Sequence, residues 1–383
     1  VVCGAQNARD GLFVVYAPPG AIIPKTNMKL KVAKIRGIES YGMLCSGYEL
    51  DESSDKEGII ELNKKEKNIG DKYFKNAGEK TLDISITPNR PDCLGVRGIA
   101  RDLASSGLGQ LKKQLPIKIN QKFKNPIKVS IKKEKEQGCG IFGSVYIKNV
   151  QNRESPEWLK KRIISLGLKP ISAIVDTTNY VMFDLNRPLH AYDADKINQE
   201  IIVRNSKKGE SFEALDNKKY TLQNNMCTIS DRSGVLGLGG IIGGTRSGTE
   251  LSTKNILLES AYFFPSQTRK TSKTLSIDTD AKYRFERGID PDSIKLGLEL
   301  GMCMILDICG GEASKLSIVG KIKDERKVID LETEKFLKVI GFSITSNEIK
   351  KILLSLGCSL RMSGKKIKVL PPTWRPDIKE DID

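Results

Sequence analysis

Residues 169–193 read KPISAIVDTTNYVMFDLNRPLHAYD and contain His190, the only histidine of the chain. The stretch opens on an apolar Pro-Ile-Ser-Ala-Ile-Val run that predicts a buried strand, and a second apolar run follows at residues 180–183. Polar residues 176–179 separate the two runs. Such an interruption favours a pocket, because a fully buried strand has no use for polar groups. The alternative is that His190 is a satisfied core histidine and the polar residues cap a turn.

The length of 383 residues predicts two to four domains. The net charge is +16, which favours a polyanion partner, nucleic acid first, although a solvated lysine-rich surface is the alternative. No run of about eighteen apolar residues occurs, so we expect no membrane span. The chain lacks an initiator methionine and stops within a polar pattern, so we expect it to be part of a longer protein.

The eight cysteines are scattered and form no Cys-x-x-Cys pair. A single histidine cannot complete a zinc site with them. We therefore expect reduced, mostly buried thiols in a cytoplasmic protein.

Residues 1–80 predict a small β-barrel. Short β-rich runs (VVCGA, LFVVYA, LKVAKI and GMLCS) alternate with turns rich in glycine and proline. The OB-fold belongs to this class and commonly binds oligonucleotides, but a barrel alone proves no ligand.

Residues 81–124 predict a strand at 82–86, a turn at 88–91, a helix to about Ser106, and a lysine-rich linker. Gly107 is the expected helix stop. Turn chemistry and helix capping account for Arg90 and Asp92. The expected apolar face of the helix consists of Val96, Ile99, Ala100 and Leu103.

Residues 125–322 predict a central α+β domain that begins with a strand near 126–131. The loop GLGGIIGG at 237–244 has neither the dinucleotide-binding nor the P-loop spacing, so its glycines more plausibly allow close backbone approach. Glu259 ends an apolar run, where a carboxylate needs a ligand or an ion-pair partner. Arg284, Glu286 and Arg287 are interpreted as a structural salt-bridge network.

Residues 323–383 predict a small helical, winged unit. Thr345 and Glu348 form a capping box before an amphipathic helix, and a hairpin turns at Ser363-Gly364. The acidic residues Asp377 and Asp383 indicate either a solvated edge or half of a divalent-metal site.

The motifs PNRPDCLG, VDTTNYV, PLHAYD, LLESA, DAKYRFERGIDP and PTWRPD occur in this order, after an OB-like segment. Together they resemble the beta subunit of bacterial-type phenylalanyl-tRNA synthetase, over essentially the whole chain. The resemblance implies a multidomain α+β fold: an OB-fold β-barrel, a mixed α+β editing domain (B3/B4-like) and a small winged-helix-like domain (B5-like, truncated). It also implies further N-terminal, catalytic-like and anticodon-binding parts outside this chain.

The family acts as an α2β2 heterotetramer on tRNA(Phe), and its alpha subunit holds ATP, phenylalanine and the aminoacylation site. The resemblance therefore implies no aminoacylation by this chain alone. It implies instead an editing site in the central domain that hydrolyses mischarged Tyr-tRNA(Phe). Such a second, editing site is needed because a hydrophobic pocket that binds phenylalanine cannot strongly exclude tyrosine, which adds one hydroxyl.

By residue-to-residue resemblance, the editing pocket falls on Thr178, Asn179, His190, Gly240, Gly243, Glu259, Thr279 and Ala281. Glu259 would accept the tyrosine hydroxyl, and His190, Thr178 and Asn179 would orient the ester and water. Lys169 stands where the family often has arginine. The lysine keeps a positive charge near the tRNA, but it cannot donate two parallel hydrogen bonds to a phosphate as arginine can. Asp377 and Asp383 fall on acidic positions for Mg²⁺ that is shared with the alpha subunit.

Two other functions are compatible with the sequence. The pocket could be inactive, which leaves a structural tRNA-docking subunit. A stand-alone OB-containing tRNA-binding factor has less support, because the central domain would then have no use. Salt-dependent tRNA binding without hydrolysis would favour either alternative.

Overall fold

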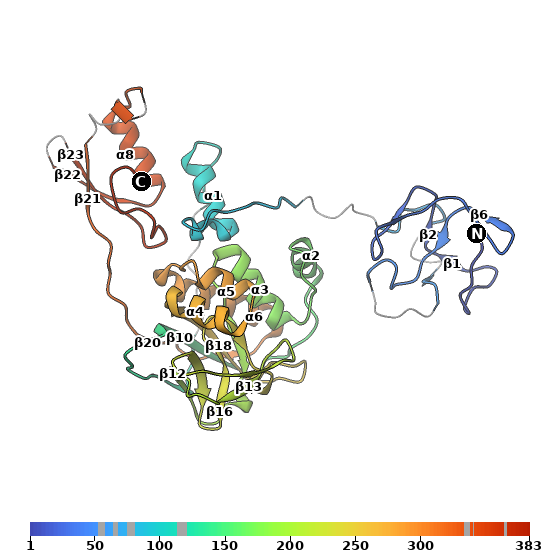
Figure 1. Ribbon diagram of the computed structural model, residues 1–383, viewed down its shortest axis with the longest axis horizontal. Helices are drawn as coiled ribbons and strands as arrows, with labels where there is room; N and C mark the ends of the chain where they lie inside the picture. The colour runs from blue at the N-terminus through green and yellow to red at the C-terminus, as the bar shows by residue number, and fades with distance from the viewer. Residues whose placement is uncertain are drawn as a thin grey trace. The chain divides into compact units, whose positions relative to one another are not determined.

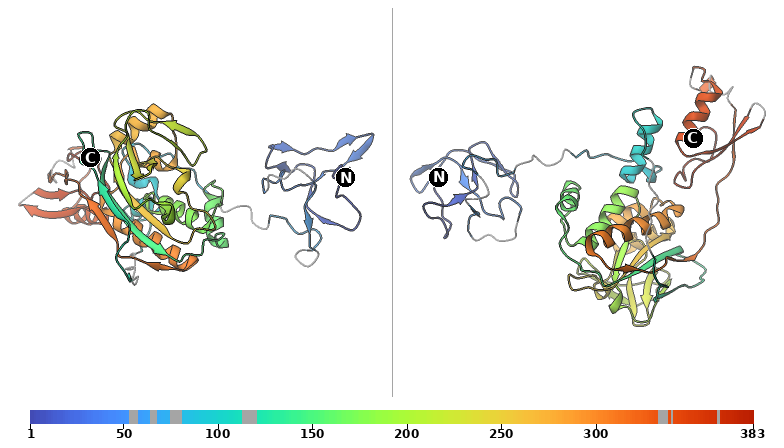
Figure 2. Two further views of the ribbon diagram at one scale, coloured as in Figure 1. Left: turned by 90° about the horizontal axis from the view of Figure 1, so that it is seen from below. Right: turned by 180° about the vertical axis from the view of Figure 1, so that it is seen from behind.

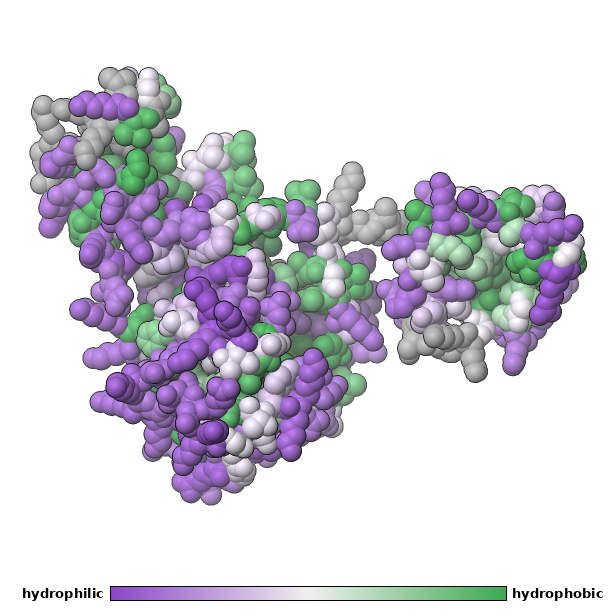
Figure 3. Space-filling model, in the orientation of Figure 1, coloured by the Kyte–Doolittle hydropathy of each residue, from purple (hydrophilic) through white to green (hydrophobic). Residues whose placement is uncertain are grey.

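The computed structural model describes residues 1–52, 58–63, 68–74, 81–112, 121–332, 338–339, 341–363 and 366–383. Its architecture is mixed α+β, and it divides into two compact units, Val1–Lys80 and Thr81–Asp383 (Figure 1). In the view of Figure 3, hydrophilic residues cover much of the visible surface of each unit, in keeping with the net charge of +16.

The described part of the first unit contains short strands and turns. The strands pair antiparallel as β1–β8, β2–β7, β3–β4 and β5–β6. Their bounds are β1 Phe13–Val14, β2 Tyr16–Ala17, β3 Ile22–Ile23, β4 Met28–Lys29, β5 Ala33–Ile35, β6 Ile38–Ser40, β7 Met43–Leu44 and β8 Glu61–Leu62. A small core of Val15, Ile23, Leu30, Cys45 and Leu50 lies among them, whereas the β5–β6 hairpin is largely exposed. The VVCGA run at residues 1–5 forms no strand.

Two five-stranded sheets form the centre of the second unit, and Figure 2 shows their strands from two further sides. The first sheet has the order β11-β18-β10-β19, and β20 also pairs with β10. All of its pairs are antiparallel. Its strands are β10 Cys139–Lys148, β11 His190–Asp193, β18 Ile256–Phe263, β19 Glu312–Ala313 and β20 Ser317–Gly320.

The second sheet has the order β17-β16-β15-β12-β9, in which only β12 and β9 run parallel. Its strands are β9 Lys128–Ile131, β12 Glu200–Asn205, β15 Cys227–Asp231, β16 Gly234–Leu238 and β17 Ile242–Gly243. The predicted strand near 126–131 is thus confirmed. A separate hairpin joins β13 Ser211–Glu213 to β14 Lys219–Thr221.

Helices of the second unit lie on one side of the strands in Figure 1. Those beside the two central sheets are α2 Glu157–Ser165, α3 Ala173–Leu185, α4 Pro265–Leu275, α5 Asp280–Phe285 and α6 Ile294–Cys309. Apolar residues of α3 and α6 share a core with β10, β11 and β18. These two helices therefore cover one face of the first sheet, and the other face is left for the second sheet.

The prediction of a buried strand around Ile171–Val175 is wrong, because helix α3 begins at Ala173. Its buried side chains recur at helical spacing: Ala173, Ile174, Thr177, Thr178, Val181 and Met182. Asp176 anchors the first turn, since it accepts hydrogen bonds from the Ser155 hydroxyl at 2.5 Å and the Ile171 amide at 2.9 Å. The polar residues therefore lie within the helix and cap no turn between strands.

Strand β18 presents alternate residues to the two sides of the first sheet. Leu257, Ala261 and Phe263 join a core with residues of the second sheet, whereas Ile256 and Leu258 join the core under α3 and α6. Glu259 follows Leu257 by two residues, so its side chain lies on the same face of the sheet as that of Leu257. Its carboxylate is therefore directed into the space between the two sheets.

The segment before the central sheets contains a 3₁₀ turn, η1 Pro91–Leu94, and helix α1 Val96–Ser105. The helix and its Gly107 stop, at φ +85°, are confirmed. Residues 82–86 form no strand, since no other strand pairs with them. Val96 and Leu103, expected on the packed face of α1, are exposed.

The C-terminal part contains a three-stranded sheet, β21-β23-β22, and helix α8. The elements are β21 Ile329–Glu332, α8 Ser346–Ser355, β22 Ser359–Ser363 and β23 Lys366–Leu370. The predicted capping box of Thr345 and Glu348 is confirmed. The predicted hairpin is also confirmed, although Gly364 of its turn lies outside the described residues.

All eight cysteines are free, and most are buried, as predicted. Within the described ranges, every helix is too short or too polar to cross a bilayer.

Candidate functional site: a pocket between two sheets

A cavity of about 90 Å³ lies between the two sheets of the second unit. One water molecule needs only about 10–15 Å³ by the same measure, so the cavity has room for a larger group. Its lining combines glycines, aromatic rings and two ionisable groups. It consists of Pro188, Leu189, His190, Tyr192, Ile229, Gly237, Leu238, Gly239, Gly240, Ile241, Ile242, Gly243, Glu259, Phe263, Ala281 and Phe285.

Cross-strand pairing brings the two ionisable groups together. His190 on β11 is the direct antiparallel partner of Glu259 on β18. Directly opposed side chains share one face of the sheet, with Cβ atoms about 4.5–5.5 Å apart. Tyr192, two residues after His190, lies on the same face, and its ring meets the imidazole edge-on at 4.4 Å between centroids.

His190 is not the satisfied core histidine considered as an alternative. Its Nε2 atom is buried and has no hydrogen-bond partner among the described residues. Burial lowers the pKa of His190 to about 4, so the imidazole is neutral at pH 7. A neutral ring with an unpartnered nitrogen in a cavity can accept a hydrogen bond from a ligand or a water molecule.

Glu259 is buried, with 6% of its surface exposed. Its Oε2 atom accepts a hydrogen bond of 2.5 Å from the Tyr192 hydroxyl. Burial raises the pKa of the Glu259 carboxyl to about 7, and the Tyr192 hydrogen bond opposes this rise. The ion pair considered as an alternative is wrong, because the partner of Glu259 is a phenol.

Two glycines keep the cavity open. Gly240 has a φ of +71°, and a Cβ atom there would lie 2.9 Å from the Phe263 ring. At Gly243 a Cβ atom would lie 2.4 Å from Cε1 and 2.8 Å from Nε2 of His190. The prediction that these glycines permit close approach is therefore confirmed, and the approaching groups are Phe263 and His190.

Gly243→Ala is expected to displace the His190 ring, because real Cβ atoms do not approach a neighbour as closely as 2.4 Å. The single histidine gives one set of imidazole signals in long-range ¹H–¹⁵N NMR spectra, so the displacement is read directly. Gly248→Ala is the matched control, since its added Cβ would meet nothing closer than 3.3 Å. Unchanged imidazole signals in Gly243→Ala would contradict the close packing of Gly243 against the His190 ring.

The structure brings His190, Gly240, Gly243, Glu259 and Ala281 together in this cavity. Thr279 lies beside it: its side chain caps α5 and donates to the carbonyl of the lining residue Ile241 at 2.7 Å.

Two further residues predicted for the pocket, Thr178 and Asn179, do not line the cavity, and neither does Lys169, which is predicted to lie near the tRNA. Thr178 and Asn179 lie on α3, and the Thr178 hydroxyl donates to Val175 of its own helix at 2.7 Å. Lys169 is exposed in the segment between α2 and α3. Helix α3, and not the predicted strand, therefore carries Thr178 and Asn179.

Sequence reasoning missed Tyr192, Phe263 and Phe285 as lining residues. Phe263 and Phe285 pack edge-on, with ring centroids 5.1 Å apart, and form an apolar wall. Tyr192 could have been found, because it follows His190 by two residues on a strand and so shares its face. The two phenylalanines come from distant segments without such a signal.

Asp377 and Asp383 do not form a metal site by themselves. Both carboxylate oxygens of Asp377 accept hydrogen bonds from Arg375, at 2.8 and 3.0 Å. Asp383 accepts from the backbone amides of Lys379 and Glu380. Both oxygens of Asp377 and Oδ2 of Asp383 thus accept hydrogen bonds within the chain, and a Mg²⁺ site would need further ligands besides these two residues.

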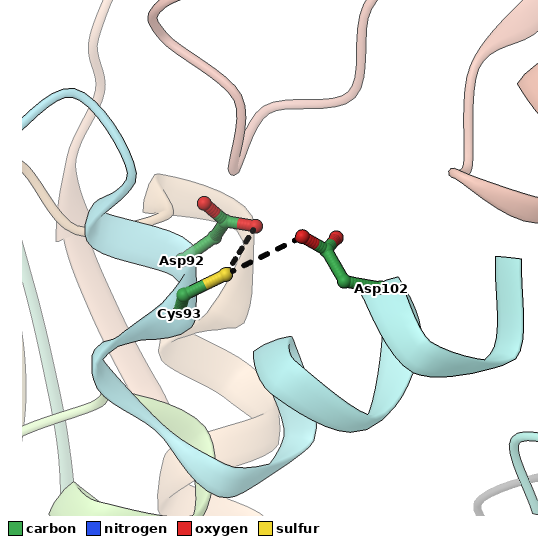
Figure 4. A group of neighbouring side chains, drawn as sticks. All are labelled: Asp92, Cys93 and Asp102. Carbon is green, nitrogen blue, oxygen red and sulfur yellow. Dashed lines mark hydrogen bonds between the residues drawn. The ribbon is translucent and has the colours of Figure 1, made fainter. Parts of the chain in front are cut away.

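A different group has atoms close enough to hold a cation: Asp92, Cys93 and Asp102, shown in Figure 4. A guanidinium already occupies this position, since Arg90 donates to Asp92 at 3.0 Å and to Asp102 at 2.6 Å. The surrounding groups, first of all burial, raise the pKa of Cys93 to about 12, so the thiol is not a ready metal ligand. The group is therefore an ionic cluster that ties η1 to α1, which goes beyond the turn chemistry predicted for Arg90 and Asp92.

Arg90→Ala is expected to lower the free energy of unfolding by about 1–3 kcal/mol, since the buried Asp92 carboxylate loses its charged donor. The measurement is urea unfolding, with Arg97→Ala, on the neighbouring helix α1, as the control. EDTA is expected to leave the wild-type transition unchanged, and a shift with EDTA would instead indicate a bound metal.

The predicted network on α5 is confirmed. Arg284 pairs with Asp280 at 3.1 Å, and Glu286 pairs with Lys282 at 3.1 Å and Arg287 at 2.8 Å. These contacts lie within α5 and the two residues that follow it, so they stabilise the helix that carries Ala281.

Three family models match the chain. A putative tRNA binding domain matches residues 1–72, a B3/4 domain matches residues 138–310, and a tRNA synthetase B5 domain matches residues 329–383. The pocket lies within the range of the B3/4 match.

Curated relatives match over the whole chain. The phenylalanine–tRNA ligase beta subunit of Ruegeria pomeroyi is 43% identical and that of Rhodospirillum rubrum is 46% identical, each over 100% of this chain and 48% of the relative. The chain thus spans about half the length of these relatives. A solved N-terminal fragment of the phenylalanyl-tRNA synthetase beta-subunit from Pyrococcus horikoshii covers 77% of this chain and 81% of its own, with 17% identity and a TM-score of 0.38. That similarity is too low to support an argument.

Proposed function

Because this chain belongs to the phenylalanine–tRNA ligase beta-subunit family, we propose that its central pocket hydrolyses Tyr-tRNA(Phe). The observation that carries the proposal is the pairing of His190 with Glu259 across β11 and β18, inside one cavity. The unpartnered Nε2 of His190 supports it further, since a buried nitrogen without a partner calls for a ligand.

The pocket has the chemistry that a second sieve requires. A synthetic site built for phenylalanine cannot strongly reject tyrosine, which adds only a hydroxyl. A site that binds this hydroxyl separates the two, because phenylalanine would leave its polar group unpaired. Glu259 is the acceptor for the para-hydroxyl, and the wall of Phe263 and Phe285 receives the ring.

Hydrolysis then requires a positioned water molecule. Its oxygen attacks the ester carbonyl carbon, the bond to the ribose oxygen breaks, and the proton of the water passes to that oxygen. The products are tyrosine and tRNA with a free hydroxyl. His190 orients the water through its neutral imidazole. The low pKa of the ring makes it a weak base, so orientation is its main contribution.

The remaining parts of the chain serve the same task. Residues 1–80 form an OB-fold that binds tRNA, residues 81–124 connect it to the editing domain at 125–322, and residues 323–383 form a small winged domain. In support, the described strands of the first unit are short and surround one small core.

The complete cytoplasmic enzyme is a heterotetramer whose alpha subunit charges tRNA(Phe) with ATP and Mg²⁺. Asp377 and Asp383 would supply at most part of the ligands of that metal, and no step proposed for this chain depends on it.

The test is release of tyrosine from Tyr-tRNA(Phe), with Phe-tRNA(Phe) as the matched substrate. It is run with this chain and with the heterotetramer assembled with the alpha subunit. Selective release of tyrosine supports the proposal. Absence of release in both preparations, with salt-dependent tRNA binding retained, would leave a structural tRNA-docking subunit.

A further inference from the structure

Tyr192 contacts both His190 and Glu259, the two ionisable groups that pair across β11 and β18. The family resemblance assigns no role to this tyrosine. It is 2% exposed, and its hydroxyl donates to Oε2 of Glu259 at 2.5 Å. Its ring meets His190 edge-on, with centroids 4.4 Å apart and planes at 78°. One side chain on β11 therefore constrains both the carboxylate and the imidazole.

The surroundings of Glu259 make this hydroxyl its principal donor. His190 and Tyr192 face the carboxylate from β11, Cys139 lies nearby on β10, and Cys227 lies nearby on β15. Among the described residues, no lysine or arginine forms an ion pair with Glu259. The hydrogen bond from Tyr192 thus stabilises the ionised carboxylate against the cost of burial.

The hydrogen bond leaves Glu259 able to bind a ligand. A carboxylate has two oxygens with about four acceptor positions, and Tyr192 occupies one of them, on Oε2. A carboxylate held at one oxygen also has fewer orientations to lose when a second donor binds. A fixed, charged acceptor is what recognition of a phenolic hydroxyl requires.

We propose that Tyr192 is a positioning residue for substrate discrimination: its hydroxyl holds the Glu259 carboxylate in the orientation that accepts the para-hydroxyl of the tyrosyl ester. This inference rests on the proposed editing function. It differs from a model in which the Tyr192 hydroxyl competes with the substrate hydroxyl for Glu259. The two models predict opposite effects when the hydroxyl is removed.

Tyr192→Phe keeps the ring against His190 and removes only the hydroxyl. The ratio of kcat/KM for Tyr-tRNA(Phe) to that for Phe-tRNA(Phe) is expected to fall about tenfold, since the hydrogen bond to a charged group is lost. The rise of kcat/KM with pH for the tyrosyl ester is expected to move to higher pH. Tyr220→Phe is the matched control, because its exposed hydroxyl likewise donates to a carboxylate, Asp216, at 2.7 Å.

A double-mutant cycle with Glu259→Gln separates positioning from a general packing effect. If Tyr192 acts through Glu259, Tyr192→Phe changes the ratio little in the Glu259→Gln background. The inference would be overturned if Tyr192→Phe lowered the kcat/KM ratio equally in the wild-type and Glu259→Gln backgrounds. It would also be overturned if the ratio in the Tyr192→Phe single variant were unchanged or higher. Thermal unfolding of each variant shows whether the fold is kept.

A measurement without substrate distinguishes failure of this inference from failure of the proposed function. The ionisation of Glu259 is followed by ¹³C NMR of the carboxyl groups in the ligand-free chain. Its pKa is expected to rise in Tyr192→Phe and to stay unchanged in Tyr220→Phe. An unchanged value in Tyr192→Phe overturns the inference even if editing is active. If the wild-type heterotetramer releases no tyrosine, the editing function is overturned. The role of Tyr192 in substrate discrimination is then overturned as well.

Discussion

His190→Ala is expected to slow tyrosine release from Tyr-tRNA(Phe) by about 10²-fold or more. The variant removes the unpartnered Nε2 to which the proposal assigns orientation of the attacking water, and it leaves the other lining residues of the cavity in place. The measurement is single-turnover deacylation by the heterotetramer, which reports the chemical step and excludes product release.

Thr274→Ala is the control for this variant. Its exposed hydroxyl on α4 donates only to the Lys270 carbonyl of the same helix, at 2.8 Å, so release is expected to stay at the wild-type rate. Unaltered release by His190→Ala would show that the imidazole takes no part in hydrolysis, even though it lines the cavity.

Glu259→Gln is expected to reduce the preference for Tyr-tRNA(Phe) over Phe-tRNA(Phe) by about 10–100-fold. A hydrogen bond to a charged group contributes about 1.5–3 kcal/mol, and glutamine keeps the size of the side chain but not its charge. Both kcat/KM values are compared at pH 8, where most Glu259 is ionised because its pKa is about 7.

The same variant tests the pH dependence. In the wild type, kcat/KM for the tyrosyl ester is expected to rise as pH passes about 7, because only the ionised carboxylate is a charged acceptor. Glu259→Gln is expected to lose this rise once uncatalysed ester hydrolysis is subtracted. The control is Glu250→Gln, the same change at an exposed residue that pairs with Lys196. A rise through pH 7 that persists in Glu259→Gln would assign the titration to another group.

Local sequence signals predicted the parts of the fold that depend on neighbouring residues. The capping box of Thr345 and Glu348 and the Gly107 stop are of this kind. Each depends on hydrogen bonds or dihedral angles within a few residues, so the chain specifies them without reference to the rest of the molecule. Five of the residues that the resemblance assigns to the pocket line one cavity.

Helix α3 shows where local signals were insufficient. Its apolar runs suit a buried strand as well as a buried helix, and the two cannot be separated by composition. Packing against α6 and the first sheet favours the helix, because it buries Ala173, Ile174, Val181 and Met182 together. This outcome is also why Thr178 and Asn179 lie off the cavity.

The sequence alone determined the residue types of the site: one histidine, one carboxylate in an apolar run, and glycines where side chains would collide. Only the tertiary structure decided how they meet. Tyr192 and Glu259 are 67 residues apart, and their hydrogen bond depends on the register of β11 against β18. A shift of one residue would turn either side chain to the opposite face, so the site depends on long-range strand pairing that no local pattern encodes.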